Sequence, residues 1–324
     1  MNLHENNKLF KEAVKFTAQQ MGILDIYIEK DYWVTLALYT IFNDPIGKET
    51  VFKGGTALSK CYGIIERFSE DIDLIVLKSE NDSSNKLTNK IRKVTKVVSE
   101  VIPEIQVDGL TRKMGMNRKT VHSYSKEFKG NYGQIRDVVV VEATWLGHHE
   151  PYVQKTVSSY IYDMMQNTAQ EEIAKKYNLL PFDVLVLDAK RTLCEKIMSL
   201  VRFSYANDPI GALQKKIRHT YDINQLLNVN EVIQFMGSND FDKMLLKVAQ
   251  DDILSYKNDN DWLKNHPKEA LIFEKTMETW EKLSETYKAD FQKLVYGDFP
   301  IESDILKSLQ KISKRLKKIV WKID

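Results

Sequence analysis

Residues 52–76 read Phe52-Lys-Gly-Gly-Thr-Ala-Leu-Ser-Lys-Cys-Tyr-Gly63 and then Ile64-Ile-Glu-Arg-Phe-Ser-Glu-Asp-Ile-Asp-Leu-Ile-Val76. In the first half, a short apolar run enters a tight glycine turn, and Thr56 is expected to cap a helix that Gly63 closes. A strand, a glycine turn and a helix N-terminus form an anion site, because backbone N–H groups point at the ligand. We therefore predict a phosphate-binding segment made of Gly54, Gly55 and Thr56, with Ser59 or Lys60 nearby.

The second half of the stretch supplies two carboxylates. Asp71 and Asp73 are two residues apart in an apolar run, so on a strand both side chains project from one face. Carboxylates about 6–7 Å apart at the Cα level repel unless a cation lies between them, and oxygen-only ligands favour Mg²⁺ or Mn²⁺ over Zn²⁺. Together with a phosphate-binding turn, such a pair is typical of metal-assisted nucleotidyl transfer.

Two simpler interpretations of this stretch stay open. A lone Asp-x-Asp also occurs in sugar transferases and on solvated strand edges, so by itself it is weak support for a metal site. The whole segment could equally be a capped helix followed by a strand with one polar face. That interpretation leaves unexplained why two acids and an anion-binding turn should face each other.

The stretch resembles a known family at this point. Glu29-Lys-Asp-Tyr-Trp33 looks like the Glu-Lys-Asp-Tyr block of the AbiEii/AbiGii-type nucleotidyltransferase toxins, a branch of the DNA polymerase β-like superfamily. Phe52–Leu74 resembles the Phe-Lys-Gly-Gly-Thr and Arg-Phe-Ser-Glu-Asp-Ile-Asp-Leu signature of that branch. Thr56 and Asp71 lie further apart than in the most compact members of the superfamily, which is usual for this branch. The resemblance covers roughly residues 25–230.

The resemblance implies an activity and its partners. Members of this branch are toxins of bacterial toxin–antitoxin or abortive-infection systems, and they transfer a nucleotide from an NTP to the 3′ end of tRNA with Mg²⁺ or Mn²⁺. A cognate antitoxin, typically a winged-helix repressor, is implied as a partner. The chain is therefore expected to be a Mg²⁺- and NTP-dependent nucleotidyltransferase that acts on tRNA or another RNA.

A third acidic ligand is expected on a neighbouring strand. Asp137-Val-Val-Val-Val-Glu-Ala-Thr-Trp145 is the strongest β-strand pattern in the chain, and Glu142 is embedded in it. Glu142 could also be an edge-strand charge that faces water. The resemblance favours the metal-ligand interpretation, since a Val-Glu or Ile-Glu pair lies on this strand in the family. Asp137, which opens the strand, is the weaker candidate.

Two predicted helices carry polar residues on apolar faces. Lys196 lies in the stripe of Leu193, Ile197 and Leu200, where its ammonium could reach a triphosphate or the leaving group. Its stem could instead pack while the ammonium reaches water. His219, Asp222, Ile223 and Leu226 share one face of the second helix, and an Arg-His-x-Tyr-Asp pattern resembles the family's helix after its essential lysine.

The resemblance assigns roles to these residues. Lys196 and Asp222 join Asp71 and Asp73 as candidate catalytic residues, and Asp222 would orient Lys196 or help activate the acceptor hydroxyl. Other members often carry Asp at the position of His219, so a catalytic role for His219 stays open.

Composition predicts the general class of the chain. With 324 residues, 43% hydrophobic and 28% charged, it can bury a large core and favours two domains. We predict an α/β (α+β) fold with a mixed, mostly antiparallel polymerase β-like sheet in a nucleotidyltransferase domain with N-terminal helices, residues 1–187. A mainly helical C-terminal domain is expected over 188–324.

The cysteines and the apolar segments indicate a compartment. Cys61 and Cys194 both fall in helical patterns, which favours reduced thiols and a cytoplasmic location. The first residues carry no apolar signal region, and no run of 18 apolar residues occurs. Neither secretion nor a membrane span is therefore expected.

Two basic tracts are candidate RNA contacts. Lys307–Lys322 holds seven Lys or Arg and no acid, with apolar residues spaced as on a helix, and Arg112–Arg136 interleaves basic residues with Tyr124, Phe128 and Tyr132. Basic loops with aromatics suit unpaired RNA ends. Each tract could instead be a solvated face, of a helix docked on its own domain or of a hairpin.

The remaining patterns predict the order of elements. Helices are expected over 5–43, near 85–101, over 161–177 and from 189 onward, a hairpin over 119–145 and a strand over 184–187. Residues 207–211 are expected to form a loop. Two other functions compete with RNA modification: a nucleotidyltransferase of the antibiotic-modifying kind, which would not need two basic tracts, and a catalytically silent RNA-binding protein.

Overall fold

The computed structural model describes residues 1–132, 135–147 and 149–323, and the chain divides into two compact units. Unit 1 consists of Met1–Gly63, Phe68–Trp145 and Tyr152–Leu187. Unit 2 consists of Ile64–Arg67, Leu146–Pro151 and Asp188–Asp324. The two short segments that cluster with unit 2 were not expected from the sequence. The predicted functional division at residue 187 stays a prediction.

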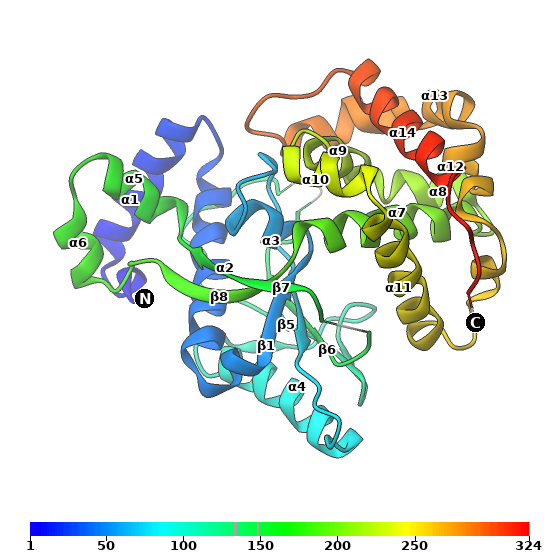
Figure 1. Cartoon of the computed structure of the whole chain (residues 1–324). Helices are drawn as coiled ribbons and strands as arrows, with labels where there is room; N and C mark the ends of the chain where they lie inside the picture. The colour runs from blue at the N-terminus through cyan, green and yellow to red at the C-terminus, as the bar shows by residue number, and fades with distance from the viewer. Residues whose placement is uncertain (133–134, 148, 324) are drawn as a thin grey trace. The chain divides into compact units, whose positions relative to one another are not determined.

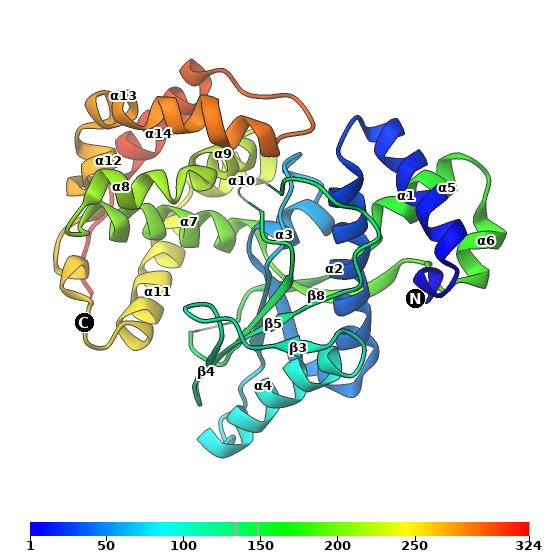
Figure 2. The same ribbon diagram turned by 180° about the vertical axis from the view of Figure 1, so that it is seen from behind.

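Unit 1 is built on one mixed sheet (Figures 1 and 2). Its strands are β1 (Thr50–Lys53), β2 (Ile72–Val76), β3 (Glu104–Ile105), β4 (Arg112–Lys113), β5 (Asn117–His122), β6 (Val139–Thr144), β7 (Tyr152–Val157) and β8 (Phe182–Leu187). They are ordered β3-β5-β6-β2-β1-β8-β7, and β4 pairs with β5. Of these pairings only β1–β8 and β2–β6 are parallel. The predicted mixed, mostly antiparallel sheet is confirmed.

Helices cover one face of this sheet. Unit 1 contains η1 (Leu3–Glu5), α1 (Asn7–Met21), α2 (Asp25–Asn43), η2 (Pro45–Glu49), α3 (Gly54–Lys60), α4 (Ser84–Ser99), α5 (Tyr160–Asn167) and α6 (Glu171–Lys176). Alternate strand residues such as Ile72, Leu74 and Val141 pack in one core with α2 and α4. Because side chains alternate across a strand, the intervening residues Asp73 and Glu142 lie on the opposite face.

Three local expectations in unit 1 were incomplete. The predicted helix over 161–177 is broken between α5 and α6, where Ala169 has a φ of 56°. Strand β7 was not predicted, because Val153 and the polar residues after it are exposed and give little apolar alternation. Glu142 was considered as an edge-strand charge, but β6 lies inside the sheet between β5 and β2.

The described residues of unit 2 form helices joined by loops, with one isolated β-bridge between Arg67 and Val295, and the region from 188 onward is mainly helical as predicted. Its elements are α7 (Ala189–Ser204), α8 (Pro209–Gln214), α9 (Ile217–Leu226), α10 (Asn230–Gly237), α11 (Asn239–Ser255), η3 (Asp261–Lys264), η4 (Pro267–Glu269), α12 (Leu271–Glu274), α13 (Thr276–Thr286), η5 (Tyr287–Phe291, a π-helical turn), η6 (Gln292–Leu294) and α14 (Glu302–Leu316). The predicted loop at 207–211 is partly wrong, because Pro209 starts α8. Asp208 caps that helix by accepting a hydrogen bond of 3.0 Å from the Gly211 N–H.

Helix α14 is the basic helix expected from the sequence, and it ends earlier than Lys322. Its apolar stripe is fully buried, with Ile305, Leu309 and Leu316 each 0% exposed. The helix therefore packs on its own unit and leaves its lysines on the outer side. Across the residues that the structure describes, no helix is both long and apolar enough to span a membrane.

Candidate active site

Three carboxylates gather on the open face of the sheet of unit 1. Asp73 of β2 is the direct partner of Glu142 in the parallel pair β2–β6, and Asp71 immediately precedes β2. Neighbouring strands lie about 4.8 Å apart, so partner side chains on one face are adjacent. Burial, together with the charges of the Asp71 and Glu142 carboxylates, raises the pKa of Asp73 to about 7. The predicted acids therefore lie close enough to repel one another.

The glycine turn lies directly against these acids. Lys53, the last residue of β1, is the antiparallel partner of Asp73. The next residue, Gly54, has a φ of +83°, and a Cβ built on it would overlap the Asp73 carboxylate. Only glycine fits this position, because both the backbone conformation and the close approach exclude a side chain. The turn predicted to bind phosphate and the predicted metal ligands thus meet at one end of β1 and β2.

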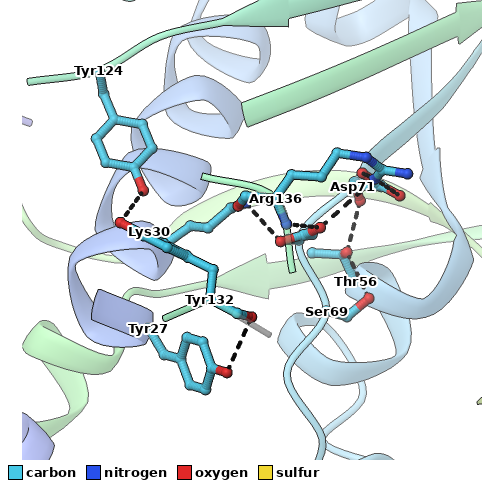
Figure 3. A network of polar contacts seen from close by, with 9 residues as sticks. Tyr27, Lys30, Thr56, Ser69, Asp71, Tyr124, Tyr132 and Arg136 are labelled. Carbon is cyan, nitrogen blue, oxygen red and sulfur yellow. Dashed lines mark hydrogen bonds and ion pairs between the residues drawn. The ribbon is translucent and has the colours of Figure 1, made fainter. Parts of the chain in front are cut away.

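Thr56 does not cap the helix, contrary to the prediction. Helix α3 begins at Gly54 with Lys53 as its N-cap, so Thr56 already lies inside it. The Thr56 hydroxyl donates a hydrogen bond of 2.7 Å to the Asp71 carbonyl and lies 3.0 Å from the Ser69 hydroxyl (Figure 3). It therefore ties α3 to the chain that enters β2. Phosphate binding by Gly54, Gly55 and Thr56 stays a prediction.

The end of α3 is occupied by a buried ion pair. The Lys60 ammonium lies 2.5 Å from Asp31 and also donates to the Ser158 carbonyl at 3.0 Å, while the lysine side chain is only 4% exposed. Ser59 is half-buried. A phosphate contact by Lys60 would have to break this pair, so the structure gives the role no support, and for both residues it stays a prediction.

Cationic and amide side chains compensate the acids. Lys119 and Arg136 were expected from the sequence only as part of a candidate RNA-binding tract, and Asn117 was not singled out. The Arg136 guanidinium donates to both oxygens of Asp71, at 3.0 and 3.2 Å. Asn117 and Lys119, on β5, each donate to Glu142 at 3.0 Å. Burial opposes ionisation of Glu142, but these two donors outweigh it and lower its pKa. Strand register alone brings Lys119 and Glu142 together, which no local pattern indicates.

These acids fit the chemistry of a divalent metal, although they do not yet form a metal site. Among the described residues, no group of three or more His, Cys, Asp or Glu side chains is arranged to hold a metal ion. The donor set is nevertheless oxygen only, as Mg²⁺ and Mn²⁺ prefer. Arg136 and Lys119 are partly exposed at 43% and 24%, so both can turn away. Asp137, the weaker candidate, pairs instead with Lys126 at 2.5 Å.

Helix α2 holds three successive buried charges behind the site. Glu29 accepts hydrogen bonds from the backbone N–H groups of Glu127 and Phe128, at 2.7 and 3.2 Å. Lys30 bonds to Glu70 at 2.6 Å and to the Arg136 carbonyl (Figure 3), and Asp31 pairs with Lys60. The Glu-Lys-Asp-Tyr block therefore fixes the Glu127–Phe128 segment, the segments at Glu70 and Arg136, and the end of α3. The signal in the sequence was three charged residues inside an otherwise apolar helix.

Unit 2 contains a second buried cluster, around Asp222. Lys196 of α7 lies 2.6 Å from one oxygen of Asp222 in α9, and Arg67 donates to both oxygens at 2.7 and 2.8 Å. Lys196 is 5% exposed and Asp222 0%. Burial opposes ionisation of Asp222, but Arg67 and Lys196 outweigh it and hold its pKa well below the usual range. The structure brings the two predicted residues together, and their catalytic roles stay predictions.

His219 lies near this cluster on α9. Burial, and then the charge of Lys196, hold the pKa of His219 well below its usual value, so the imidazole is neutral. Its buried Nδ1 has no hydrogen-bond partner among the described residues. Arg67 was the residue missed here: it belongs to the Arg-Phe-Ser-Glu-Asp run, yet nothing in the spacing of that run links it to a helix 155 residues later.

A sheet bearing clustered acids beside a glycine turn is the arrangement of a nucleotidyl-transferring enzyme, and comparison with known proteins agrees with that class. Residues 36–315 match the nucleotidyl transferase AbiEii toxin family of type IV toxin–antitoxin systems. The chain belongs to this family, as its motifs predicted. Membership implies a nucleotide substrate and an antitoxin partner. No curated protein sequence matches the chain.

Among solved structures, the chain is similar to MenT4, a nucleotidyltransferase toxin from Mycobacterium tuberculosis H37Rv. The TM-score is 0.56 with 17% sequence identity, over 95% of this chain and 90% of that one. At this identity the likeness concerns the fold alone. It agrees with the predicted mixed sheet and mainly helical C-terminal region.

Proposed function

We propose that this protein is the toxin of a type IV toxin–antitoxin pair and transfers a nucleoside monophosphate from an NTP to a hydroxyl of RNA, at the 3′ end of tRNA. The observation that carries the proposal is the in-register pair of Asp73 and Glu142, with Asp71 beside them and the Gly54 turn against Asp73. The RNA hydroxyl would attack the α-phosphate, a new P–O bond would form, and pyrophosphate would leave.

Asp71, Asp73 and Glu142 would hold Mg²⁺ or Mn²⁺, which when bound supplies positive charge at the phosphates and at the attacking hydroxyl. Around it, the chain's own groups have separate tasks. The backbone of Gly54 and Gly55 would donate hydrogen bonds to phosphate oxygens, with Thr56, Ser59 and Lys60 as the further predicted contacts. Lys53, whose charge already acts on Asp73, is an additional candidate for phosphate binding.

In unit 2, Lys196 would neutralise the triphosphate and the developing charge on pyrophosphate. Asp222 would act as a positioning residue, because it holds the Lys196 ammonium at 2.6 Å. Arg67 grips the same carboxylate with two hydrogen bonds, so the cluster carries one more positive than negative charge. Two cations that share one buried carboxylate support a phosphate-binding role for Lys196.

RNA is favoured over a small-molecule acceptor by the basic tracts. Lys311, Lys314, Lys317 and Lys318 lie exposed on or just after α14, and a small acceptor would not need them. Within the same proposal, the partner is an antitoxin of the winged-helix repressor kind, and the protein acts in the cytoplasm.

Incubation with each α-labelled NTP, Mg²⁺ and bulk tRNA tests this function. Label should appear in tRNA with at least one NTP, and EDTA should abolish it. A parallel reaction with an aminoglycoside in place of RNA covers the antibiotic-modifying alternative. Label in the aminoglycoside and none in RNA, or RNA binding without product from any NTP, would contradict the proposal.

A further inference from the structure

Unit 1 contains a cavity of about 660 Å³ that is lined by part of the basic tract Arg112–Arg136, and Arg136 in its lining bonds to Asp71. Its walls come from the segments that follow β3 and β5 and from the segment that leads into β6. Ile105, Val107 and Leu110 supply an apolar wall, and Phe128 and Tyr132 add aromatic rings. Lys126, Lys129 and Arg136 also line it. This volume lies in the range of cavities that hold small organic ligands.

The walls of this cavity are held by buried charges of α2. Glu29 is 0% exposed and fixes the backbone N–H of Phe128, while the fully buried Lys30 holds the carbonyl of Arg136. The Tyr27 hydroxyl donates to the Tyr132 carbonyl at 3.4 Å (Figure 3). A loop that is merely solvated does not need three anchors from a core helix. The cavity is therefore a built feature of the fold.

The charged and aromatic residues that line the cavity indicate an anionic ligand with a flat ring system. Three cations and the carboxylate of Asp137 line the cavity, and Asp137 is already paired with Lys126. Of the other two cations, Lys129 is exposed, and Arg136 is paired with Asp71 at 3.0 Å but is itself 43% exposed. Aromatic rings beside cations and an apolar wall are what an unpaired nucleotide requires, with its base stacked and its phosphate neutralised.

Position relative to the acids distinguishes the donor nucleotide from the acceptor strand. The Gly54 turn, expected to bind the triphosphate, lies on the β1 side of Asp73, whereas the cavity lies on the β6 and β5 side. Arg136 lines the cavity and reaches Asp71 with its guanidinium. A smaller cavity of about 240 Å³ next to Glu142 shares Leu110 with it and adds Arg112 and Lys119.

We infer that this cavity binds an unpaired nucleotide of the acceptor RNA, close to the 3′ hydroxyl that is to be modified. The inference rests on the proposed function, since it names the subsite of its acceptor. Tyr132 and Phe128 contact the base, and Lys129 and Arg136 contact the backbone phosphates.

Binding of a fluorescent single-stranded RNA of about ten nucleotides tests the inference, a length within the usual range of single-strand sites. Fluorescence anisotropy is measured in EDTA without NTP, so the readout does not depend on transfer. Tyr132→Leu should weaken binding about 10-fold, the loss that follows removal of one stacking ring. Lys129→Ala should reduce the slope of log K against log salt concentration by about 1.

A filling variant and matched controls guard against misfolding. Leu110→Trp puts an indole into the cavity and should weaken RNA binding about 10-fold, as the loss of one stacked base does. Lys15→Ala and Tyr39→Leu remove the same residue types elsewhere in unit 1, at an exposed and a half-buried position outside the cavity lining. Both controls should bind RNA as the wild type does, and the five variants are compared with the wild type by thermal unfolding.

The outcomes separate this inference from the proposed function. Unchanged RNA affinity in all three cavity variants overturns the subsite. If the wild type still labels tRNA, the proposed function stands without it. A raised KM for NTP, or lost antitoxin binding, with RNA affinity unchanged overturns it and identifies a different occupant. Weakened RNA binding in the cavity variants supports the subsite, even if the wild type transfers no nucleotide and the proposed function therefore fails.

Discussion

At the scale of single residues, the central feature of unit 2 is one carboxylate that holds two cations. Asp222 is fully buried, and each of its oxygens accepts from Arg67, while one also accepts from Lys196. Removing one partner of a buried charge pair is costly when it leaves the other uncompensated. The cluster therefore predicts unequal effects for substitutions at its members.

Asp222→Asn should destabilise the chain more than Lys196→Met. The first change leaves two buried cations without their carboxylate, which costs about 3–5 kcal/mol. The second leaves Asp222 gripped by Arg67 and removes one charge-assisted hydrogen bond, which costs about 1–3 kcal/mol. Urea unfolding at pH 7 measures both free energies. Equal losses would contradict the view that Arg67 anchors the carboxylate.

Catalysis should respond to Lys196 far more than stability does. If its ammonium binds phosphate, Lys196→Met should lower kcat/KM by about 10²-fold or more, the scale of losing one preorganised charge-stabilising group. Lys196→Arg should rescue poorly, since a planar fork does not replace a compact ammonium. Transfer at the wild-type rate by the Met variant would withdraw the catalytic assignments of Lys196 and Asp222 together.

The same carboxylate predicts a pH dependence of stability. The pKa of Asp222 in the folded chain lies below its ordinary value of 3.8, so the folded state favours the ionised form. Its stabilising contribution is complete above that ordinary value and is lost as pH falls through the folded pKa. The stability difference between wild type and Asp222→Asn should thus be constant above about pH 5 and shrink below about pH 4. Urea midpoints from pH 7 to pH 3 measure it, and a difference that grows in acid would refute the assignment.

At the scale of elements, helix α2 holds the segments that surround the acids of unit 1 through its buried charged residues. Its residues Glu29, Lys30 and Asp31 are 0–3% exposed and hold two loop regions and the end of helix α3. Burial lowers the pKa of Lys30 and raises that of its partner Glu70, and the attraction between the two ions opposes both shifts. The helix thus carries three buried charged residues where apolar side chains would pack, and these residues fix neighbouring segments of unit 1.

A double-mutant cycle tests the pair of Lys30 and Glu70. Lys30→Met leaves a buried carboxylate without its main partner and should cost about 3–5 kcal/mol, while adding Glu70→Gln should recover part of that loss. As a control, Lys86→Met removes a lysine that is 63% exposed and paired with Asp82, which should change stability by less than about 1 kcal/mol. Additive effects of the two buried substitutions would mean that the pair is not coupled.

Helix α14 carries a prediction about RNA. Replacing Lys311, Lys314, Lys317 and Lys318 by Ala should weaken RNA binding and lower its salt slope, with little change in KM for NTP. Arg315 is excluded from this set, because its guanidinium bonds to the carbonyls of Met236 and Ser238 and supports the fold. Since the four lysines are exposed, thermal stability should not change. An unaltered salt slope would limit α14 to packing on its own unit.

At the scale of the whole molecule, local patterns could be predicted from the sequence, whereas long-range contacts could not. Strands β1, β2, β6 and β8, the glycine turn and the spacing of Asp71 and Asp73 were predictable because they depend on apolar patterning and on backbone freedom. The strand pattern of residues 137–145 singled out Glu142, and the resemblance favoured a metal-ligand role for it. The structure adds that Glu142 is the strand partner of Asp73. The fold class followed from the same motifs and from the family that carries them.

Contacts that depend on register or on distant helices were not predictable. Lys119 and Arg136 meet the acids only because β5 and the segment before β6 pack where they do, and Arg67 meets Asp222 across 155 residues. Thr56 was misassigned as a cap because its better partner, the Asp71 carbonyl, is supplied by tertiary structure. A capping preference is weak beside such a contact.

The most direct test of the account compares tRNA labelling by wild type and Asp73→Asn under identical conditions, with thermal unfolding of both proteins. The Asn side chain keeps the volume and relieves repulsion among three carboxylates, so the variant should be as stable as the wild type or slightly more stable. Because Asp73 is the acid between Asp71 and Glu142, labelling should fall at least 10²-fold, the scale of losing a charge-stabilising group. A folded Asp73→Asn variant that labels tRNA at a near-normal rate would contradict the assignment of the active site.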